Sequence, residues 1–95
     1  MDRSPRSSLE MDRRIGRNLR ARRTSLSLTL GEVAGVCGIS FQQVHKYERG
    51  ANKISAEALW RIAKFLGAPL SSFYEDFDAE TAASEAPVMG RQTAG

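Results

Sequence analysis

Apolar residues recur at helical spacing in several stretches of this chain, and no strand is predicted. Two of these stretches each place four apolar side chains at positions i, i+3, i+4 and i+7, which form one face of a helix. The members are Leu30, Val33, Ala34 and Cys37 in the first stretch and Leu59, Ile62, Ala63 and Leu66 in the second. The spacing predicts helices over residues 29–37 and 55–66, the second of which ends at Gly67.

A third short helix is predicted over residues 40–49, and its two faces differ. Ser40 and Gln43 have the spacing of a capping box, and Gly50 follows where a left-handed residue commonly ends a helix. Val44 and Tyr47 are three residues apart and share the inner face. The side chains that point elsewhere are amides and cations, which suit the base edges of the major groove. They are Gln42, Gln43, Lys46 and Arg49.

The connection between the helices predicted over residues 29–37 and 40–49 is short. Thr29 and Glu32 form another capping-box pair at the start of the first helix, and Gly38 and Ile39 lead from its end to Ser40. Two short helices joined by a turn of three or four residues that contains glycine are typical of a helix-turn-helix unit. A longer helix is predicted before this unit, over residues 10–25. Its inner side is expected to carry Ile15, Leu19, Leu26 and either Arg22 or Arg23.

From Ile15 to Phe73 the chain resembles the Cro/C1-type repressors, also called the Xre family. The resemblance is carried by residues 29–34, the turn at 38–40, residues 46–50 and the helix at 59–66. It implies an all-α, five-helix fold like that of lambda repressor, with the fifth helix running from Pro69 to about Tyr74. It also implies a sequence-specific DNA-binding transcriptional regulator, with a repressor as the expectation. Such a protein binds a palindromic operator as a dimer, with helix 40–49 in the major groove.

Charge is distributed unevenly along the 95 residues, whose formal net charge is +3. Residues 1–23 contain eight arginines and three acidic residues, whereas residues 74–95 contain five acidic residues and one arginine. A basic front indicates a polyanionic partner. Three parts are predicted: a flexible basic arm at 1–9, the helix-turn-helix DNA-binding domain at 10–77, and a disordered acidic tail at 78–95.

The resemblance assigns the residues nearest the bases, which are Phe41, Gln42, Gln43 and Lys46. A glutamine can bond both N6 and N7 of adenine, and a lysine can donate to O6 and N7 of guanine. Phe41 departs from the family, which often has a polar residue there. Its ring either packs on a thymine methyl group or lies back against Leu30.

Contacts to phosphate are expected at the edges of the motif, where they set register and affinity rather than sequence preference. The expected residues are Arg22, Thr29, Ser40, Arg49, Asn52 and Lys53. Leu30 replaces a phosphate-binding glutamine that is common in the family, so one such contact is lost. The resemblance also pairs Arg23, late in the first helix, with Glu48, late in helix 40–49. This pair is expected to be mainly structural.

The resemblance places a homodimer interface on the fifth helix and on the loop before the fourth. The corresponding residues are Ala56, Leu70, Phe73 and Tyr74. The alternative is that Phe73 closes the core and Leu70 has no specific role. Trp60 lies opposite Leu59 and Ile62 on its helix and is available to a partner of unassigned kind.

Other classes of function have little support in the sequence. The single Cys37 and single His45 cannot form a metal cluster, and no activated nucleophile is visible, so neither an enzyme, a metal site nor a cofactor is expected. No apolar run is long enough to span a bilayer, and the predicted location is the cytoplasm, on the nucleoid. Besides double-stranded DNA, a regulatory protein is a possible partner. The alternative function is an antitoxin-like or adaptor protein whose acidic tail binds that partner.

Overall fold

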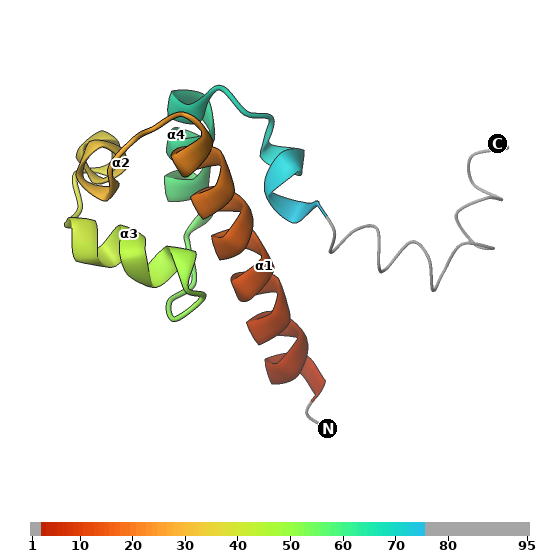
Figure 1. The fold of residues 1–95 in the computed structure, drawn as a ribbon. Helices are drawn as coiled ribbons and strands as arrows, with labels where there is room; N and C mark the ends of the chain where they lie inside the picture. The colour runs from red at the N-terminus through yellow and green to blue at the C-terminus, as the bar shows by residue number, and fades with distance from the viewer. Residues whose placement is uncertain (1–2, 76–95) are drawn as a thin grey trace, which may run out of the picture.

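The computed structural model describes residues 3–75, which fold into four α-helices and a short 3-10 helix without any strand in that range (Figure 1). The helices are α1 (Arg3–Ser25), α2 (Leu30–Cys37), α3 (Phe41–Glu48), α4 (Ala56–Leu66) and the 3-10 helix η1 (Leu70–Tyr74). The predicted all-α class is confirmed. The predicted acidic tail at 78–95 lies outside the described residues.

The boundaries of α2, α3 and α4 are set by caps that the sequence already contains. The hydroxyl oxygens of Thr29, Ser40 and Ser55 each accept a hydrogen bond from the backbone N–H three residues later, at 3.0, 3.2 and 3.1 Å. At the start of α2 the capping box is complete, because the backbone N–H of Thr29 also donates to the carboxylate of Glu32 at 2.7 Å. These bonds satisfy N–H groups that have no partner within the helix, so each helix begins within one residue of its predicted start.

Helix α1 begins earlier than predicted, but it ends at the predicted residue, Ser25. It begins at Arg3 rather than residue 10, so most of the predicted flexible arm at 1–9 is helical. Pro5 does not prevent this, because the N–H groups of a first helical turn have no partner within the helix. At the other end, α1 stops at Ser25 and Ser27 adopts a positive φ of 59°. Leu26 therefore leaves the helical periodicity and is exposed, so its predicted place on the inner side is wrong.

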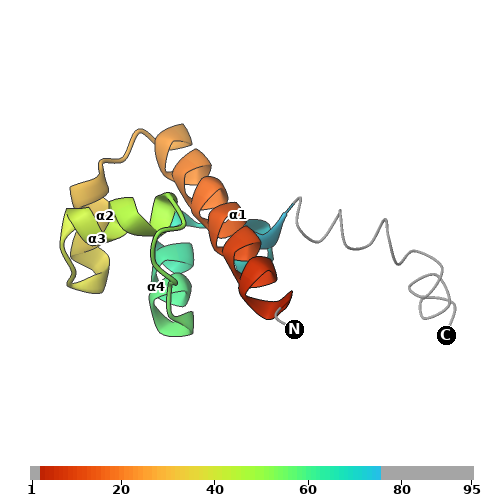
Figure 2. The same ribbon diagram turned by 90° about the horizontal axis from the view of Figure 1, so that it is seen from below.

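The core lies where α1, α2, α3, α4 and η1 meet. All the helices contribute to it, and its buried members are Ile15, Leu19, Val33, Ala34, Val44, Leu59, Ile62, Ala63, Leu66 and Phe73. Both apolar stripes predicted for α2 and α4 face this core, with Leu30 and Cys37 only partly buried at its edge. Seen from two directions, α1 passes the C-terminal end of α3 (Figures 1 and 2). The close approach there depends on Gly16.

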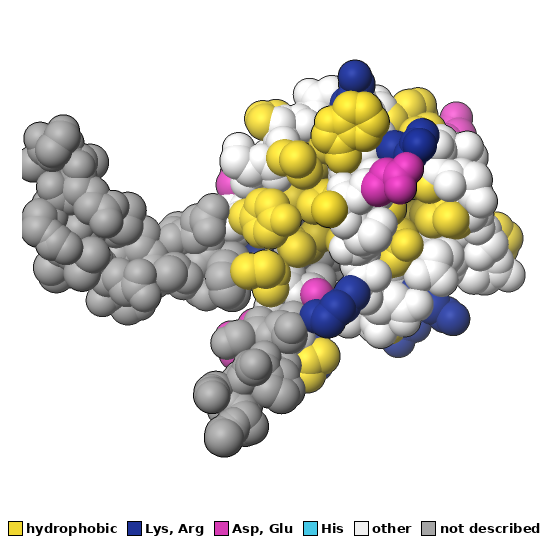
Figure 3. All heavy atoms as spheres, turned by 180° about the vertical axis from the view of Figure 1, so that it is seen from behind, with side chains coloured by type: hydrophobic (Ala, Val, Ile, Leu, Met, Phe, Trp, Pro, Cys, Tyr) yellow, Lys and Arg dark blue, Asp and Glu magenta, His cyan; other side chains and the backbone are white. Residues whose placement is uncertain are grey.

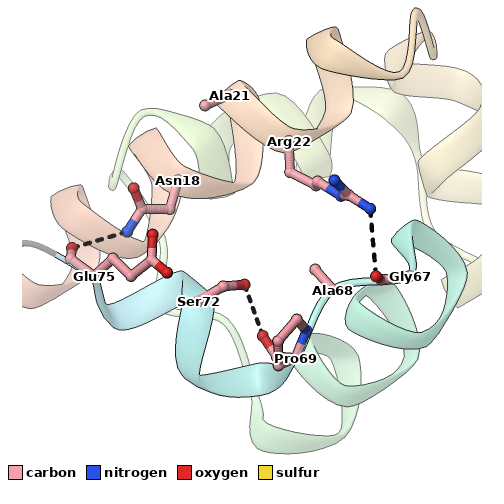
Figure 4. Close-up of a pocket in the computed structure, with 8 residues that line it drawn as sticks. All are labelled: Asn18, Ala21, Arg22, Gly67, Ala68, Pro69, Ser72 and Glu75. Atoms are coloured by element: carbon pink, nitrogen blue, oxygen red, sulfur yellow. Dashed lines mark hydrogen bonds between the residues drawn. The ribbon is translucent and has the colours of Figure 1, made fainter.

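The fifth helix is a 3-10 helix rather than an α-helix, which corrects the predicted five α-helices. Five residues are too few for a stable α-helix, and η1 is held largely by other elements. Asn18 on α1 donates from Nδ2 to the carbonyl oxygens of Phe73 and Glu75 at 2.8 and 3.1 Å. Figure 4 shows the bond to Glu75. Phe73 itself is buried in the core. These contacts fix the end of the described chain against α1.

Among the residues that the structure describes, no helix combines the length and the hydrophobicity needed to cross a bilayer.

Candidate nucleic-acid interface

The two faces of α3 have different surroundings, as the sequence predicted. Val44 and Glu48 are buried against the rest of the molecule. The opposite face carries polar and basic side chains. Four of them are exposed, namely Gln42, His45, Lys46 and Arg49, and Gln43 is half-buried. A helix with this division is fixed on its inner side and can present donors and acceptors on its outer side.

Phe41 occupies the first position of α3, and 54% of its surface is exposed. Leu30, against which the Phe41 ring would lie if it did not contact a thymine methyl group, is partly buried at the edge of the core. An aromatic ring with this exposure at the N-terminal end of α3 is accessible to a ligand that approaches the outer face. It lies next in sequence to the exposed Gln42.

The predicted pair of Arg23 and Glu48 is present and has two-pronged geometry. Nε of Arg23 lies 2.6 Å from Oε2 of Glu48, and Nη2 lies 3.0 Å from Oε1. Nη1 donates a third bond, to the carbonyl of Leu28 at 2.8 Å. Only 12% of the arginine side chain and 2% of the glutamate side chain are exposed. The hydrogen bonds that Arg23 donates to the Glu48 carboxylate raise the pKa of Arg23 and outweigh the effect of burial, so the guanidinium stays charged.

This pair connects the end of α1 with the last turn of α3, while Gly16 makes the contact at the middle of α1. A Cβ atom at position 16 would overlap the carbonyl oxygen of Tyr47 and lie 2.5 Å from that of Glu48. The backbones of the two helices therefore touch. The position of the outer face of α3 is set by α1 through these two contacts.

Most of the predicted phosphate contacts lie at the N-termini of α2 and α3 or in the loop after α3. Thr29 and Ser40 are exposed N-caps, and Arg49 and Asn52 are exposed at the end of α3 and in the loop. Nζ of Lys53 lies 3.2 Å from Oδ2 of Asp12, but 67% of the lysine side chain is exposed. These groups flank the outer face of α3 along the chain.

Arg22 is the exception, because its side chain points toward the C-terminal end of α4. Its Nε donates to the carbonyl of Leu66 at 3.0 Å, and its Nη2 donates to that of Gly67 at 3.3 Å (Figure 4). The last carbonyls of a helix have no partner within it, and a cation near them is favourable. Arg22 therefore caps α4, and the contact of its guanidinium with phosphate stays a prediction.

The predicted dimer residues have unequal exposure. Leu70 is 40% exposed, Ala56 is exposed and Tyr74 is half-buried, but Phe73 is 1% exposed. The alternative for Phe73 is thus confirmed, since its ring closes the core rather than contributing to an interface. Seen from behind, hydrophobic side chains gather over α4 and η1 (Figure 3). An apolar surface is present there without Phe73.

A helix-turn-helix family model matches residues 19–73, which is more than half of the chain and includes α2, α3 and α4. The chain belongs to the Cro/C1-type helix-turn-helix family. A Rhodospirillum rubrum protein named as a transcriptional regulator in the ATPase CF(0) region is 46% identical over 68 residues, or 72% of this chain and 63% of that protein. An HTH-type transcriptional regulator of Sinorhizobium medicae is 39% identical over 66 residues, or 70% of this chain and 48% of that protein.

The chain therefore spans between about a half and 63% of the length of these two relatives. Among solved structures, the DNA-binding domain of BldD is similar with a TM-score of 0.60 at 30% identity. That match covers 67% of this chain and 93% of the BldD domain. The helix-turn-helix fold is common to all of these proteins.

Two residues of this family member were not singled out from the sequence, although both position the candidate site. Gly16 could have been identified from the sequence, because an isolated glycine inside a helical pattern commonly indicates close packing. Asn18 gave no such indication, because its partners are backbone carbonyls more than fifty residues away. Contacts over that separation follow from the tertiary fold alone.

Cys37 has a structural environment rather than a reactive one. Its side chain is partly buried at the edge of the core, with Sγ 3.9 Å from the carbonyl of Ala58. Burial raises the pKa of the thiol, which keeps it protonated at neutral pH. In the described part of the chain, no group of three or more possible metal ligands comes together.

Proposed function

We propose that this chain is a sequence-specific DNA-binding transcriptional regulator that places α3 in the major groove. The observation that carries the proposal is the division of α3 between a fixed inner face and an exposed outer face. The outer face presents Gln42, Lys46 and Arg49, while Val44 and Glu48 hold the helix in place. Membership of the helix-turn-helix family supports the same function.

Base recognition is assigned to four residues of α3. Gln42 and Gln43 suit adenine, because an amide can donate to N7 and accept from N6 at the same time. Lys46 suits the two acceptors of guanine, and the exposed ring of Phe41 suits a thymine methyl group. Each good contact of this kind contributes about 1–3 kcal/mol of discrimination.

Phosphate binding is assigned to the groups that flank α3, which set the register of the helix in the groove. They are Thr29, Ser40, Arg49, Asn52 and Lys53. The exposed N-termini of α2 and α3 add backbone N–H groups, since helix N-termini favour anions. Arg22 is left out because it caps α4.

We further propose that the regulator is a repressor that acts as a homodimer on a palindromic operator. A single recognition helix contacts few base pairs, so two symmetry-related copies are needed for selectivity. Leu70, Tyr74 and Ala56 provide exposed or half-exposed surface for this contact on η1 and at the first residue of α4. Repression follows if the occupied operator overlaps a promoter, and a reporter gene placed behind the selected site tests it.

Replacing single outer-face residues tests base recognition directly. A preferred site is first selected from random duplexes, and binding of Lys46→Ala and Gln42→Ala is then measured on that site and on a random duplex. Each change is expected to weaken specific binding by about 1–3 kcal/mol and to relax the preference at one position per half-site. Lys64→Ala is the control for Lys46→Ala, because Lys64 is also exposed but lies on α4. Equal losses on the selected and the random duplex would refute base recognition by these residues.

A second candidate function is that of a protein adaptor, favoured by an apolar surface between α2 and α4. Trp60 and Phe65 are 50% and 43% exposed, and they line a shallow hollow together with Val36. Purified protein that shows no salt-dependent binding to any duplex, but a defined protein partner, would favour this function.

A further inference from the structure

Three arginines lie on the outer face of α1, apart from the residues assigned to DNA above. Arg13, Arg17 and Arg20 are spaced at i, i+4 and i+7, so they share one face of the helix, and all three are exposed. Within the described residues, none of these three side chains has an ion pair. We name these three residues the arginine stripe.

The arginine stripe has a fixed position beside the end of α3. A Cβ atom on Gly50, directly after α3, would lie 2.8 Å from Cγ of Arg13, so this part of the stripe touches the start of the α3–α4 loop. Gly16, between Arg13 and Arg20, packs on the last carbonyls of α3. Further along α1, Arg23 is bound to Glu48. These contacts hold the stripe rigidly relative to the outer face of α3.

Helix α1 itself continues past the end of α3 toward its N-terminus. The N-terminal half of α1 extends past the α3–α4 loop in both ribbon views (Figures 1 and 2). Asp12 on α1 binds Lys53 of that loop, which ties the two segments together. The exposed cations of α1 and the loop therefore form one basic edge, interrupted by the exposed carboxylate of Glu10.

We propose that Arg13, Arg17 and Arg20 bind the phosphate backbone of duplex DNA that lies outside the base pairs contacted by α3. This inference rests on the proposed function and adds a second, sequence-independent contact to it. Arginine suits the role because its planar guanidinium stays charged and can donate two hydrogen bonds to one phosphate. Rows of cations about 6 Å apart along a rigid helix can follow a backbone without contacting bases.

The test compares a stripe variant with a control of equal charge. Arg17→Gln with Arg20→Gln removes two stripe cations and leaves Arg13, whose stem packs on Gly50. Arg61→Gln with Lys64→Gln removes two exposed cations from α4. Binding is measured over a range of salt on a selected site of minimal length and on the same site with about 10 extra base pairs on each side.

The parent and the control are expected to bind the longer duplex more tightly, and the stripe variant is expected to lose this gain. Its plot of log K against log salt on the longer duplex should become shallower by about 1.8, at roughly 0.9 per lost phosphate contact. A slope and a flanking gain equal to those of the control would overturn the arginine stripe as a DNA contact. Failure of the parent to bind any duplex would instead overturn the proposed function itself, and the stripe with it.

Discussion

Arg23 connects the stability of the molecule to the placement of its candidate recognition surface. Its guanidinium bridges Glu48 and the carbonyl of Leu28, so one side chain fixes α3 and the chain before α2 against α1. Both charges are largely buried, and a buried charge that loses its partner is strongly unfavourable. The pair therefore acts as a positional constraint, since its removal affects the fold before it affects any ligand.

Glu48→Ala is expected to destabilise the fold by about 3–5 kcal/mol, because it leaves the Arg23 guanidinium without its partner near the interior. The double change Arg23→Ala with Glu48→Ala should recover part of that loss, since no unpaired charge then remains. Urea denaturation of the two single variants, the double variant and the parent measures the coupling. Single effects that simply add in the double variant would contradict the pairing.

The neighbouring residues Arg22 and Arg23 also show which side-chain contacts could not be predicted from the sequence. Arg22 and Arg23 point about 100° apart on the helix, so only one of them can face α3. The family resemblance correctly assigned Arg23 to Glu48. The role of Arg22 depends on the carbonyls of Leu66 and Gly67, which follow it by more than forty residues. No local pattern contains that information.

At the scale of the helices, boundaries with local chemical signals were predictable and those without were not. Thr29, Ser40 and Ser55 cap their helices as the sequence indicates, and Gly38 and Gly67 end α2 and α4 with φ of 67° and 65°. The start of α1 has no such signal, so the sequence placed it seven residues too late. Burial of Phe73 is likewise a tertiary outcome, since the apolar sequence of η1 suits a core and an interface equally.

The close packing of α1 against α3 depends on the absence of a side chain at Gly16. Gly16→Ala is expected to cost about 3 kcal/mol, because the new methyl group would overlap backbone carbonyls of α3 that cannot rotate away. Gly35→Ala is the matched control. That glycine lies within α2 with open space around it, so the change should stabilise the protein by up to about 1 kcal/mol through helix propensity.

Thermal or urea denaturation measures the change in the free energy of unfolding for both variants. Duplex binding by any folded Gly16→Ala protein reports the position of α3. Similar stabilities for the two alanine variants would mean that the α1–α3 contact tolerates a side chain.

At the scale of the whole molecule, different properties lie on different surfaces. Most of the exposed cations follow α3, the loop after it and one side of α1, whereas apolar side chains gather over α4 and η1, with Arg61 and Lys64 exposed among them on α4. The family resemblance anticipated this arrangement, but composition alone did not, because the net charge of +3 is small. A surface that binds a polyanion and a separate surface that binds a second copy are compatible with one dimeric regulator.

The proposed dimer predicts a specific stoichiometry on DNA. Two protein chains should bind one duplex that carries an inverted repeat, with half-sites centred about 10 base pairs or a multiple apart, because the recognition helices of such dimers lie about 34–36 Å apart. Leu70→Glu should impair this binding without unfolding the protein, since Leu70 is exposed on η1. A carboxylate there would be desolvated and would face its own symmetry mate if η1 lies at the twofold axis.

Leu26→Glu provides the control for this change, because Leu26 is 41% exposed against 40% for Leu70 and lies in the α1–α2 connection instead of η1. Sedimentation of the parent and both variants with a palindromic duplex, and with a single half-site, measures the stoichiometry. The parent and Leu26→Glu should form two-to-one complexes on the palindrome, while Leu70→Glu should bind the half-site normally and the palindrome without cooperativity. A one-to-one complex for the parent would contradict the dimer, and a two-to-one complex retained by Leu70→Glu would place the interface away from η1.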